Sequence, residues 1–324
     1  MRALASPASC KGALSAVGAA LALAAGLRAR GVDADEVPVA DGGEGTTEVF
    51  AATLGGDWRT APASDPLGRV VSARYLVLVD GTAVVEAAEA VGLARLANNE
   101  RDPMRASSSG LGELLLAVAA ETGGPIFVGL GDSATVDGGA GLREVVGDAL
   151  SGRELWALCD VRNPLLGERG AARAFGPQKG ASPDQVEKLE ARLAGMAELR
   201  PYAGLAGAGA AGGLGAAIAS LGGELVSGAE LVLERIGFRA LATGADLVVT
   251  GEGTIDRSSG EGKAVGEVVR ICGEEDVRCV VFGGRVEAAL PGVETHVLSG
   301  DSSRAAEDLV ELGALLADAL LGRS

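Results

Sequence analysis

Short apolar runs rich in β-branched residues alternate with helical stretches at both ends of the chain, and no other sequence feature limits the fold as strongly. Such alternation is typical of parallel βα units. It predicts strands at residues 3–6, 36–40, 246–250, 278–282 and 295–298, and helices at residues 14–28, 46–54, 263–273 and 303–321. The expected fold class is α/β, with a doubly wound, Rossmann-like parallel sheet built from both chain ends.

The middle of the chain follows a different pattern. Two alternating segments, 70–79 and 82–87, are separated by Asp80-Gly81, which is a strong hairpin signal. Further buried strands are expected at 126–130 and 154–159, and the glycine-rich run 204–217 is expected to be a structured turn that opens a helix. A chain of 324 residues is long enough for two cores. We predict one discontinuous domain, 1–61 with 235–324, an inserted mixed α/β domain at 62–234, and an active site in the cleft between these two lobes.

The charge and the cysteines exclude several classes of protein. The chain has 28 basic and 44 acidic residues, a formal charge of −16, which argues against nucleic-acid binding. The four cysteines have no CxxC spacing, and a single histidine gives no zinc ligand set. The apolar stretch 13–27 is too short to span a membrane and lacks a convincing signal-peptide cleavage site. We therefore expect a cytoplasmic protein without a membrane partner.

The first of four polar, glycine-rich segments is Asp41-Gly42-Gly43-Glu44, which follows a predicted strand and precedes a helix. Backbone N–H groups in such a loop can receive an anion. Asp41 and Glu44 can hold a magnesium ion or accept a proton from a substrate. The same residues also fit a simple turn with a capping acid, and this segment alone does not separate the two interpretations.

Three further segments have similar chemistry. Residues 129–141 run from a strand into glycines, hydroxyls and acids, as phosphate binding requires, but without a Walker A lysine. Residues 250–256 are followed by Lys263, which can be a phosphate ligand or a solvated lysine beside a helix cap. Residues 159–164 and 175–180 supply cations, among them Lys179, although most lysines are simply solvated.

Together these segments resemble the bacterial-type glycerate kinase family, and the resemblance covers nearly the whole chain. The motifs that carry it are CKGALSA (10–16), VPVADGGEGT (37–46), DPLGR (65–69), VVEAAEAVGL (84–93), SSSGLGELL (107–115), GDSATVDGGAGL (131–142), CDVRNPLLGERGAARAFGPQKGA (159–181), GAGAAGGLGAA (207–217), TGEGTID (250–256) and GKA (262–264). The resemblance implies ATP-dependent phosphorylation of D-glycerate, with ATP and Mg²⁺ bound between two α/β lobes. A homodimer is a further expectation.

We hypothesise site roles on the basis of this resemblance. The expected catalytic residues are Asp41, as base or orienter of the acceptor hydroxyl, with Lys11, Asp160 and Lys179. The expected magnesium ligands are Asp137, Asp160 and Glu252. The residues expected to bind substrate or nucleotide are Gly42, Gly43, Glu44, Arg105, Ser107, Gly131, Ser133, Thr135, Gly138, Gly209, Gly212 and Lys263.

Four positions depart from the family pattern: Ala8, Ser109, Val136 and Thr254 stand where the family commonly has Asp, Tyr, Asn and Arg. Two alternatives therefore remain beside an active glycerate kinase. One is a kinase for another small sugar acid. The other is a nucleotide- or metabolite-binding relative that has lost turnover. A dinucleotide-dependent oxidoreductase is disfavoured because no well-formed GxGxxG follows a strand.

Overall fold

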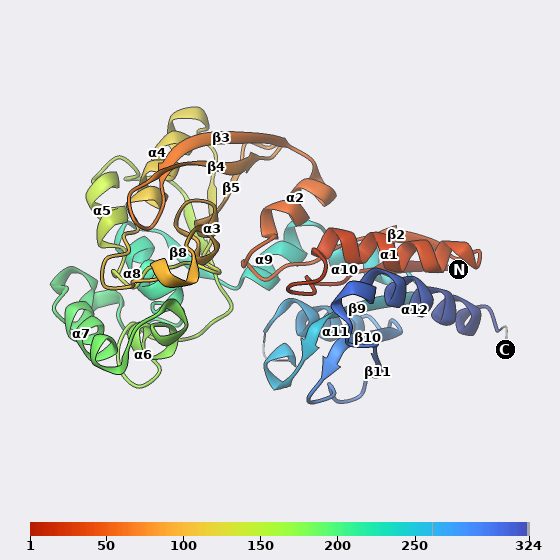
Figure 1. Cartoon of the computed structure of the whole chain (residues 1–324). Helices are drawn as coiled ribbons and strands as arrows, with labels where there is room; N and C mark the ends of the chain where they lie inside the picture. The colour runs from red at the N-terminus through yellow and green to blue at the C-terminus, as the bar shows by residue number, and fades with distance from the viewer. Residues whose placement is uncertain (261, 323–324) are drawn as a thin grey trace. The chain divides into compact units, whose positions relative to one another are not determined.

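A computed structural model describes residues 1–260 and 262–322 of the chain (Figure 1). The chain forms two compact units. Unit 1 contains Met1–Asp41, Glu48–Leu54 and the chain from Ala229 onward, and unit 2 contains Gly42–Thr47 and Gly55–Gly228. The sequence predicts domain limits after residues 61 and 234, whereas the main passages between the units follow Leu54 and Gly228.

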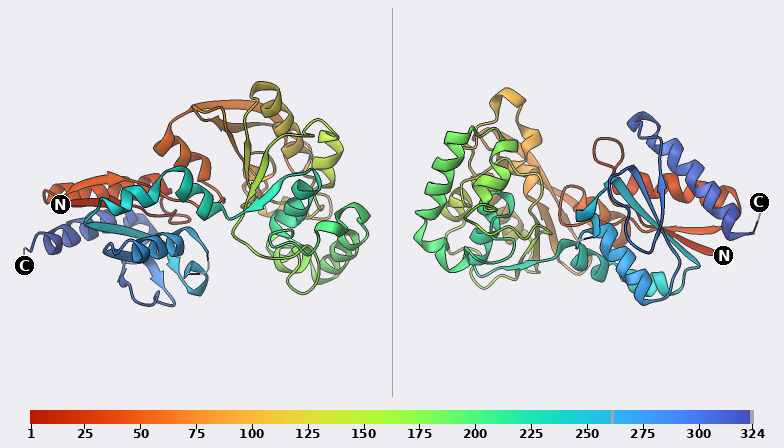
Figure 2. Two further views of the ribbon diagram at one scale, coloured as in Figure 1. Left: turned by 180° about the vertical axis from the view of Figure 1, so that it is seen from behind. Right: turned by 90° about the horizontal axis from the view of Figure 1, so that it is seen from below.

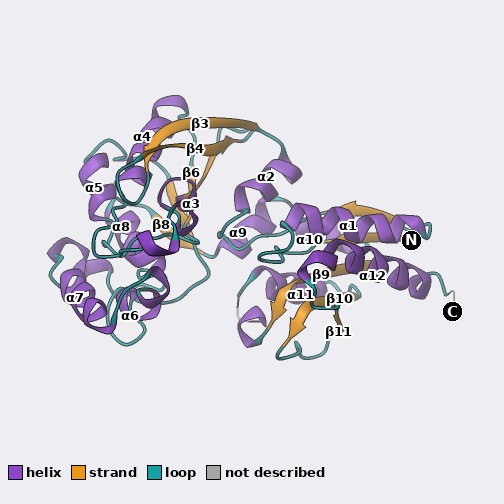
Figure 3. Ribbon diagram, in the orientation of Figure 1, coloured by secondary structure: helices purple, strands orange, loops and turns teal. Residues whose placement is uncertain are grey.

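Unit 1 is built on a parallel sheet with the strand order β11-β10-β9-β1-β2 (Figure 3). Its central pair joins the two ends of the chain, since Ala3 of β1 lies opposite Leu247 of β9. The elements are β1 (Arg2–Ala5), α1 (Ala16–Ala29), β2 (Asp33–Glu36), α2 (Thr46–Leu54), α9 (Gly228–Arg235), α10 (Phe238–Thr243), β9 (Leu247–Ile255), α11 (Ala264–Glu274), β10 (Cys279–Val286), β11 (Glu294–Val297) and α12 (Ala305–Leu320), with 3₁₀ turns η5 (Arg257–Gly260) and η6 (Ser302–Arg304).

Helices cover both faces of this sheet, as the doubly wound prediction requires. On one face, Leu23 of α1 and Leu309 of α12 pack on Phe282 of β10. On the other, Val265 of α11 packs on Val281, also of β10. Figure 2 shows α1 and α12 on one side of the strands and α11 on the other. The predicted fold class is therefore confirmed for this unit.

Unit 2 has a mixed sheet with the order β3-β4-β5-β6-β7-β8. The first three strands are antiparallel, and β5 to β8 run parallel. The elements are β3 (Asp57–Ser64), β4 (Val70–Val77), β5 (Ala83–Glu86), α3 (Ala87–Val91), α4 (Ser109–Glu121), β6 (Ile126–Gly129), α5 (Ala140–Val146), β7 (Leu155–Leu158), α6 (Ala171–Phe175), α7 (Pro183–Ala194), α8 (Ala210–Ser220) and β8 (Glu224–Val226), with 3₁₀ turns η1 (Leu93–Arg95), η2 (Asn98–Glu100), η3 (Pro177–Lys179) and η4 (Ala197–Tyr202).

Local signals placed strands β4 to β7 and the helix α8 of this unit correctly. At the predicted hairpin, Asp80 accepts a hydrogen bond from Thr82 N at 2.9 Å, and Gly81 has φ +84°. The positive φ is the conformation that glycine adopts at no steric cost. The run 204–217 does open a helix, and residues 211–213 at the start of α8 have left-handed backbone angles.

The sequence analysis was wrong about three of the edge strands, β2, β3 and β8. The strand expected at 36–40 lies at Asp33–Glu36, and β3 and β8 were not predicted. The sequence of β2 is DADE, without the apolar pattern of a buried strand, and Arg2 of β1 pairs with Asp35 at 2.7 Å. Val37 N and Val39 N still bond to Ala5 O and Pro7 O, so the apolar segment continues beside β1 after the strand ends.

Two helical glycines of unit 1 test how closely α1 and α12 pack. A Cβ added at Gly26 of α1 would lie 2.1 Å from Val310 O of α12, whereas one added at Gly273 of α11 meets nothing within 4 Å. We expect Gly26→Ala to lower the free energy of unfolding by about 1–3 kcal/mol because the helices must separate. We expect Gly273→Ala to raise it by about 0.5–1 kcal/mol. Urea denaturation measures both, and equal effects would contradict the close packing.

Candidate active site

The carboxyl ends of the parallel strands in unit 2 carry one group of the predicted site residues of that unit. Glu86 ends β5, residues 130–139 follow β6, and Asp160 follows β7. These three strands are neighbours in the sheet. In open α/β sheets, ligands bind at this edge.

Lys179 connects the cation-bearing segment to the glycine-rich loop. Its Nζ donates to Ser133 Oγ at 3.0 Å and to Thr135 O at 2.8 Å. The side chain is only 3% exposed. Burial lowers the pKa of Lys179 to about 7, and the carboxylates of Asp137 and Asp132 oppose this shift. Lys179, Ser133 and Thr135 were all selected from the sequence as site residues. The structure places Lys179 in hydrogen-bond contact with the other two.

Asp137 organises the same loop through four accepted hydrogen bonds. Its Oδ2 accepts from Ser108 N at 2.9 Å, Ser108 Oγ at 2.7 Å and Gly141 N at 3.2 Å, and its Oδ1 accepts from Gly139 N at 3.0 Å. The residue is 2% exposed. Since both oxygens are occupied by donors, these contacts favour a structural role for Asp137, and its role as a magnesium ligand stays a prediction.

The predicted glycines at 138, 209 and 212 lie where two backbone segments touch. Gly138 N donates to Gly212 O at 3.1 Å. A Cβ added at Gly212 would lie 1.9 Å from Thr135 O, and one added at Gly209 would lie 2.2 Å from Pro164 O. Glycine is required here because any side chain would separate the loop from the start of α8. Thr135 Oγ1 is buried beside this contact without a hydrogen-bond partner.

The acid-bearing loop after Asp41 packs on the same edge of the unit 2 sheet. A Cβ added at Gly42 would lie 2.8 Å from Leu158 O, and one added at Gly131 would lie 2.6 Å from Gly43 Cα. Glu44 is exposed. Sequence reasoning missed Glu86, which accepts hydrogen bonds from Gly45 N and Thr47 N. Its signal was present in VVEAAEAVGL, where an acid ends a fully buried strand.

The remaining predicted residues of unit 2 have separate surroundings. Asp160 Oδ1 accepts from Ser227 Oγ at 3.0 Å and from Gly228 N at 2.9 Å, at the start of α9. Arg105 is exposed in the turn that precedes α4. Ser107 Oγ accepts from Ser109 N at 3.2 Å. A Cβ added at Gly141 would lie 2.3 Å from Ser107 Oγ, so Ser107 borders the loop that Asp137 organises.

Unit 1 holds a second group of predicted residues, around Glu252 of β9. Ala8 N donates to Gly251 O at 2.9 Å, so the chain that leads to Lys11 runs beside β9. A Cβ added at Gly253 would lie 3.4 Å from Lys11 N. Burial of the Cys10 thiol raises its pKa to about 11, and the negative charge of Glu252 adds to this shift.

Several neighbouring groups shift the pKa of the Glu252 carboxyl group in opposite directions. Burial raises its pKa, a hydrogen bond from Ser259 and the charge of Lys263 lower it, and Asp41 and Asp256 raise it. Its Oε1 is buried without a hydrogen-bond partner. The charges of Asp41 and Lys263 therefore act on Glu252, and Lys11 lies beside the next residue of β9, Gly253.

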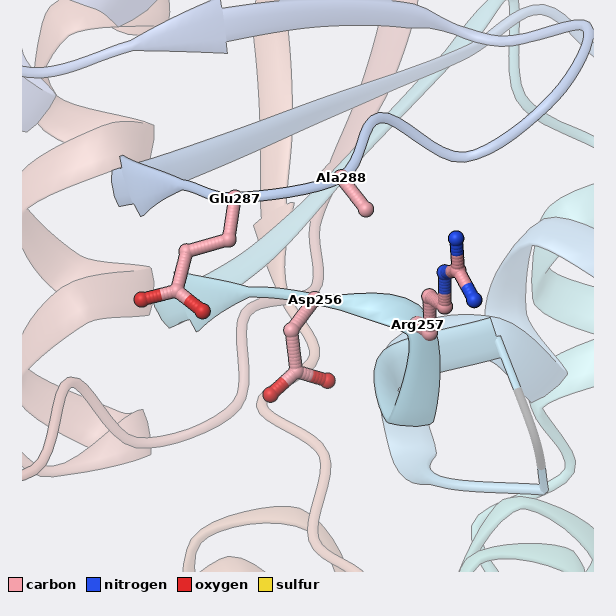
Figure 4. A pocket seen from close by; sticks show the side chains of 4 residues that line it. All are labelled: Asp256, Arg257, Glu287 and Ala288. Carbon is pink, nitrogen blue, oxygen red and sulfur yellow. The ribbon is translucent and has the colours of Figure 1, made fainter.

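A hollow adjoins this group and is lined by Asp256, Arg257, Glu287 and Ala288 (Figure 4). In Figure 4 the carboxylates of Asp256 and Glu287 point to the same side, and Arg257 lies across from Glu287. Glu287 N donates to Ile255 O at 2.8 Å, which fixes one wall of the hollow to the end of β9. The hollow therefore opens beside Asp256, one of the charges that acts on Glu252.

Two features of residues 1–260 and 262–322 bear on metal and membrane binding. No group of three or more His, Cys, Asp or Glu side chains in this range could hold a metal ion. Mg²⁺ usually needs only one or two carboxylates because phosphates and waters complete its shell. No helix in the described part of the chain is long and apolar enough to cross a membrane.

Comparison with known proteins decides the family. The sequence model of the glycerate kinase family matches residues 3–154 and 146–307. The chain belongs to the glycerate kinase family. It is 39% identical over 303 residues to the glycerate 2-kinase of Escherichia coli strain K12, covering 81% of this chain and 80% of the relative. It is 35% identical to a glycerate kinase of Halalkalibacterium halodurans, covering 90% of this chain and 87% of that protein.

A solved structure agrees with this family assignment. The crystal structure of a Salmonella typhimurium LT2 protein assigned as a glycerate kinase 2 matches with a TM-score of 0.86 and 32% identity, covering 99% of this chain and 98% of that one. The family resemblance and the mixed α/β fold are thus confirmed, and the protein is a kinase that acts on small molecules.

The pH dependence of stability tests the environment of Lys179 in this kinase. Its folded-state pKa of about 7 lies below the ordinary value of 10.5, so the unfolded chain binds more protons between these pH values. The free energy of unfolding should therefore rise with pH across this window, with up to about 1.4 kcal/mol per pH unit from this group. Below pH 7 the cost of burying the charge is fully present.

Urea denaturation at pH 7, 8 and 9 measures this contribution. The contribution should disappear in Lys179→Met and persist in Lys188→Met, which changes an exposed lysine of α7. An identical pH slope in the wild type and Lys179→Met would contradict a buried lysine with a lowered pKa.

Proposed function

We propose that this member of the glycerate kinase family transfers the γ-phosphoryl group of ATP to the 2-hydroxyl of D-glycerate, with Mg²⁺, in the cytoplasm. The observation that carries the proposal is the environment of Glu252 in unit 1. One oxygen of its carboxylate is buried without a hydrogen-bond partner, and the charges of Asp41 and Lys263 act on this carboxylate. The E. coli relative is named a glycerate 2-kinase, which supports the 2-position. The four free thiols support a reducing compartment.

The residues fit both ATP and Mg²⁺. Glu252 Oε1 is a hard oxygen ligand of the kind that Mg²⁺ prefers, and Lys263 would compensate phosphate charge nearby. When bound, Mg²⁺ neutralises charge on the transferring group. In unit 2, two of the three Nζ donors of Lys179 go to Ser133 and Thr135, which leaves a third for a phosphate or carboxylate oxygen.

Phosphoryl transfer requires alignment and charge compensation more than a strong nucleophile. In the proposed step, the acceptor oxygen bonds to the γ-phosphorus as the bond between that phosphorus and the β,γ-bridging oxygen breaks. The hydroxyl proton passes to the Asp41 carboxylate, and ADP leaves. Lys11 and Lys263 supply positive charge beside this carboxylate, and Arg105 and Ser107 remain proposed contacts for the acceptor.

The four departures from the family pattern have different surroundings in the fold. Val136 is fully buried in an apolar cluster with Leu165 and Leu189, and Ala8 packs among apolar side chains around Ile255. Thr254 is exposed, and Ser109 begins α4. Two of the four substitutions, at positions 8 and 136, are therefore accommodated as apolar packing.

Phosphorus NMR of the product tests the reaction. With D-glycerate and Mg-ATP, we expect one new phosphomonoester signal that coincides with added 2-phosphoglycerate, together with ADP. A signal that coincides with 3-phosphoglycerate would correct the position only. Binding of ATP by calorimetry without any product from D-glycerate or other sugar acids would overturn the proposal in favour of a nucleotide-binding relative.

Replacement of Asp41 tests the proposed base. Asp41→Asn keeps the shape of the side chain but cannot accept the proton, so kcat should fall about 10²-fold or more. Asp33→Asn, an exposed position on β2 of the same unit, is the matched control and should retain full activity. Steady-state assay of ADP release gives both values, and unchanged turnover in Asp41→Asn would remove it from this role.

A further inference from the structure

The start of α2 is held by a carboxylate from a distant strand. A helix leaves its first four N–H groups without partners inside the helix. At the start of α2, Thr47 N donates to Glu86 Oε1 at 2.8 Å and the preceding Gly45 N donates to Glu86 Oε2 at 3.2 Å. One side chain, 39 and 41 residues away in sequence, thus supplies two acceptors.

Glu86 is fixed at the end of a strand, and burial of its carboxylate has a cost in free energy. It is the last residue of β5, where it lies opposite Gly129 of β6, and it is 7% exposed. Burial raises its pKa, while the bonds from Thr47 and Gly45 oppose that shift. A neutral Gln of the same shape would remove the cost of burying this charge, but it would also remove one of the two hydrogen bonds that Glu86 accepts.

The segment that Glu86 holds needs an external constraint. Asp41 to Thr46 contains three glycines, and Gly42 and Gly45 have φ +85° and +91°. Glycine visits these angles freely but also leaves them freely. Gly42 and Gly43 are limited by close contact with Leu158 and Gly131, whereas a Cβ at Gly45 would meet nothing within 4 Å. Side-chain packing therefore does not restrict Gly45, and its hydrogen bond to Glu86 supplies a constraint.

We infer that Glu86 is a positioning residue of this kinase, whose carboxylate holds the backbone of Gly45 and Thr47 and so fixes the loop that begins at the proposed base, Asp41. Glu86 acts through this backbone and does not touch substrate. Its catalytic consequence rests on the proposed role of Asp41, but the clamp itself is a property of the fold.

The test is Glu86→Gln in the full-length enzyme, measured in three ways. The amide has one acceptor oxygen in place of two, so one of the two N–H groups would face an NH₂ donor. Hydrogen exchange of the peptide that covers residues 42–54 should become about 10-fold faster, since one bond of about 1.4 kcal/mol is lost. kcat should fall about 10- to 100-fold while KM for ATP changes less than about 3-fold, because misplacement affects turnover more than binding.

The thermal midpoint separates positioning from a merely structural role. Because the variant no longer buries a charge, its midpoint should stay within about 3 °C of the wild type although kcat falls. Glu113→Gln is the matched control, since Glu113 also accepts one backbone and one further hydrogen bond, both from Ser64 at the end of β3. It should leave exchange of residues 42–54 unchanged.

The exchange and kinetic measurements test the clamp and the positioning role separately. Unchanged exchange in Glu86→Gln, or equal acceleration in Glu113→Gln, would overturn the clamp. Faster exchange with unchanged kcat would overturn the positioning role. If the wild type phosphorylates no acceptor, the proposed function fails, whereas the exchange experiment still tests whether Glu86 holds the loop.

Discussion

At Gly212 a side chain would meet the carbonyl oxygen of Thr135 at 1.9 Å, and at Gly139 it would meet Ala217 Cβ at 2.2 Å. Direct contact between two backbone segments is possible only because these residues have no side chain. The loop after β6 depends on this contact, and through it so do the positions of Asp137, which bonds the loop to Ser108, and of Lys179, which bonds Ser133 and Thr135. The polar chemistry of unit 2 is therefore supported by glycine packing.

Local and long-range determinants explain what the sequence could predict. The hairpin at Asp80-Gly81 and the buried strands β6 and β7 follow from turn chemistry and apolar runs, which need no partner to be recognised. The edge strands β2 and β8 have no such pattern, because they are stabilised by pairing with a neighbour that lies far away in the chain. The motifs located candidate residues, but only coordinates revealed that both oxygens of Asp137 are occupied by donors.

Two acids at the sheet edge of unit 2 both cap the start of a helix, a role that residue type alone did not indicate. Glu86 after β5 and Asp160 after β7 each accept a backbone N–H at the start of a helix, α2 and α9 respectively. Both helices begin in unit 2 and continue into unit 1. For Asp160 the sequence suggested catalysis and metal binding. For Glu86 it showed only an acid at the end of a buried strand, because an acid that caps a distant helix has no local sequence signature for that role.

The pairing of β1 with β9 has a consequence for biosynthesis. Ala3 cannot meet Leu247 until some 250 residues have left the ribosome, whereas every strand of unit 2 lies between Asp57 and Val226. Domains generally fold as units during translation. The inserted unit can therefore fold first. During this time β1 and the apolar helix α1 of the amino-terminal segment lack the strand β9 with which β1 pairs in the folded protein. Nascent chains of this kinase should depend on chaperones mainly through that early segment.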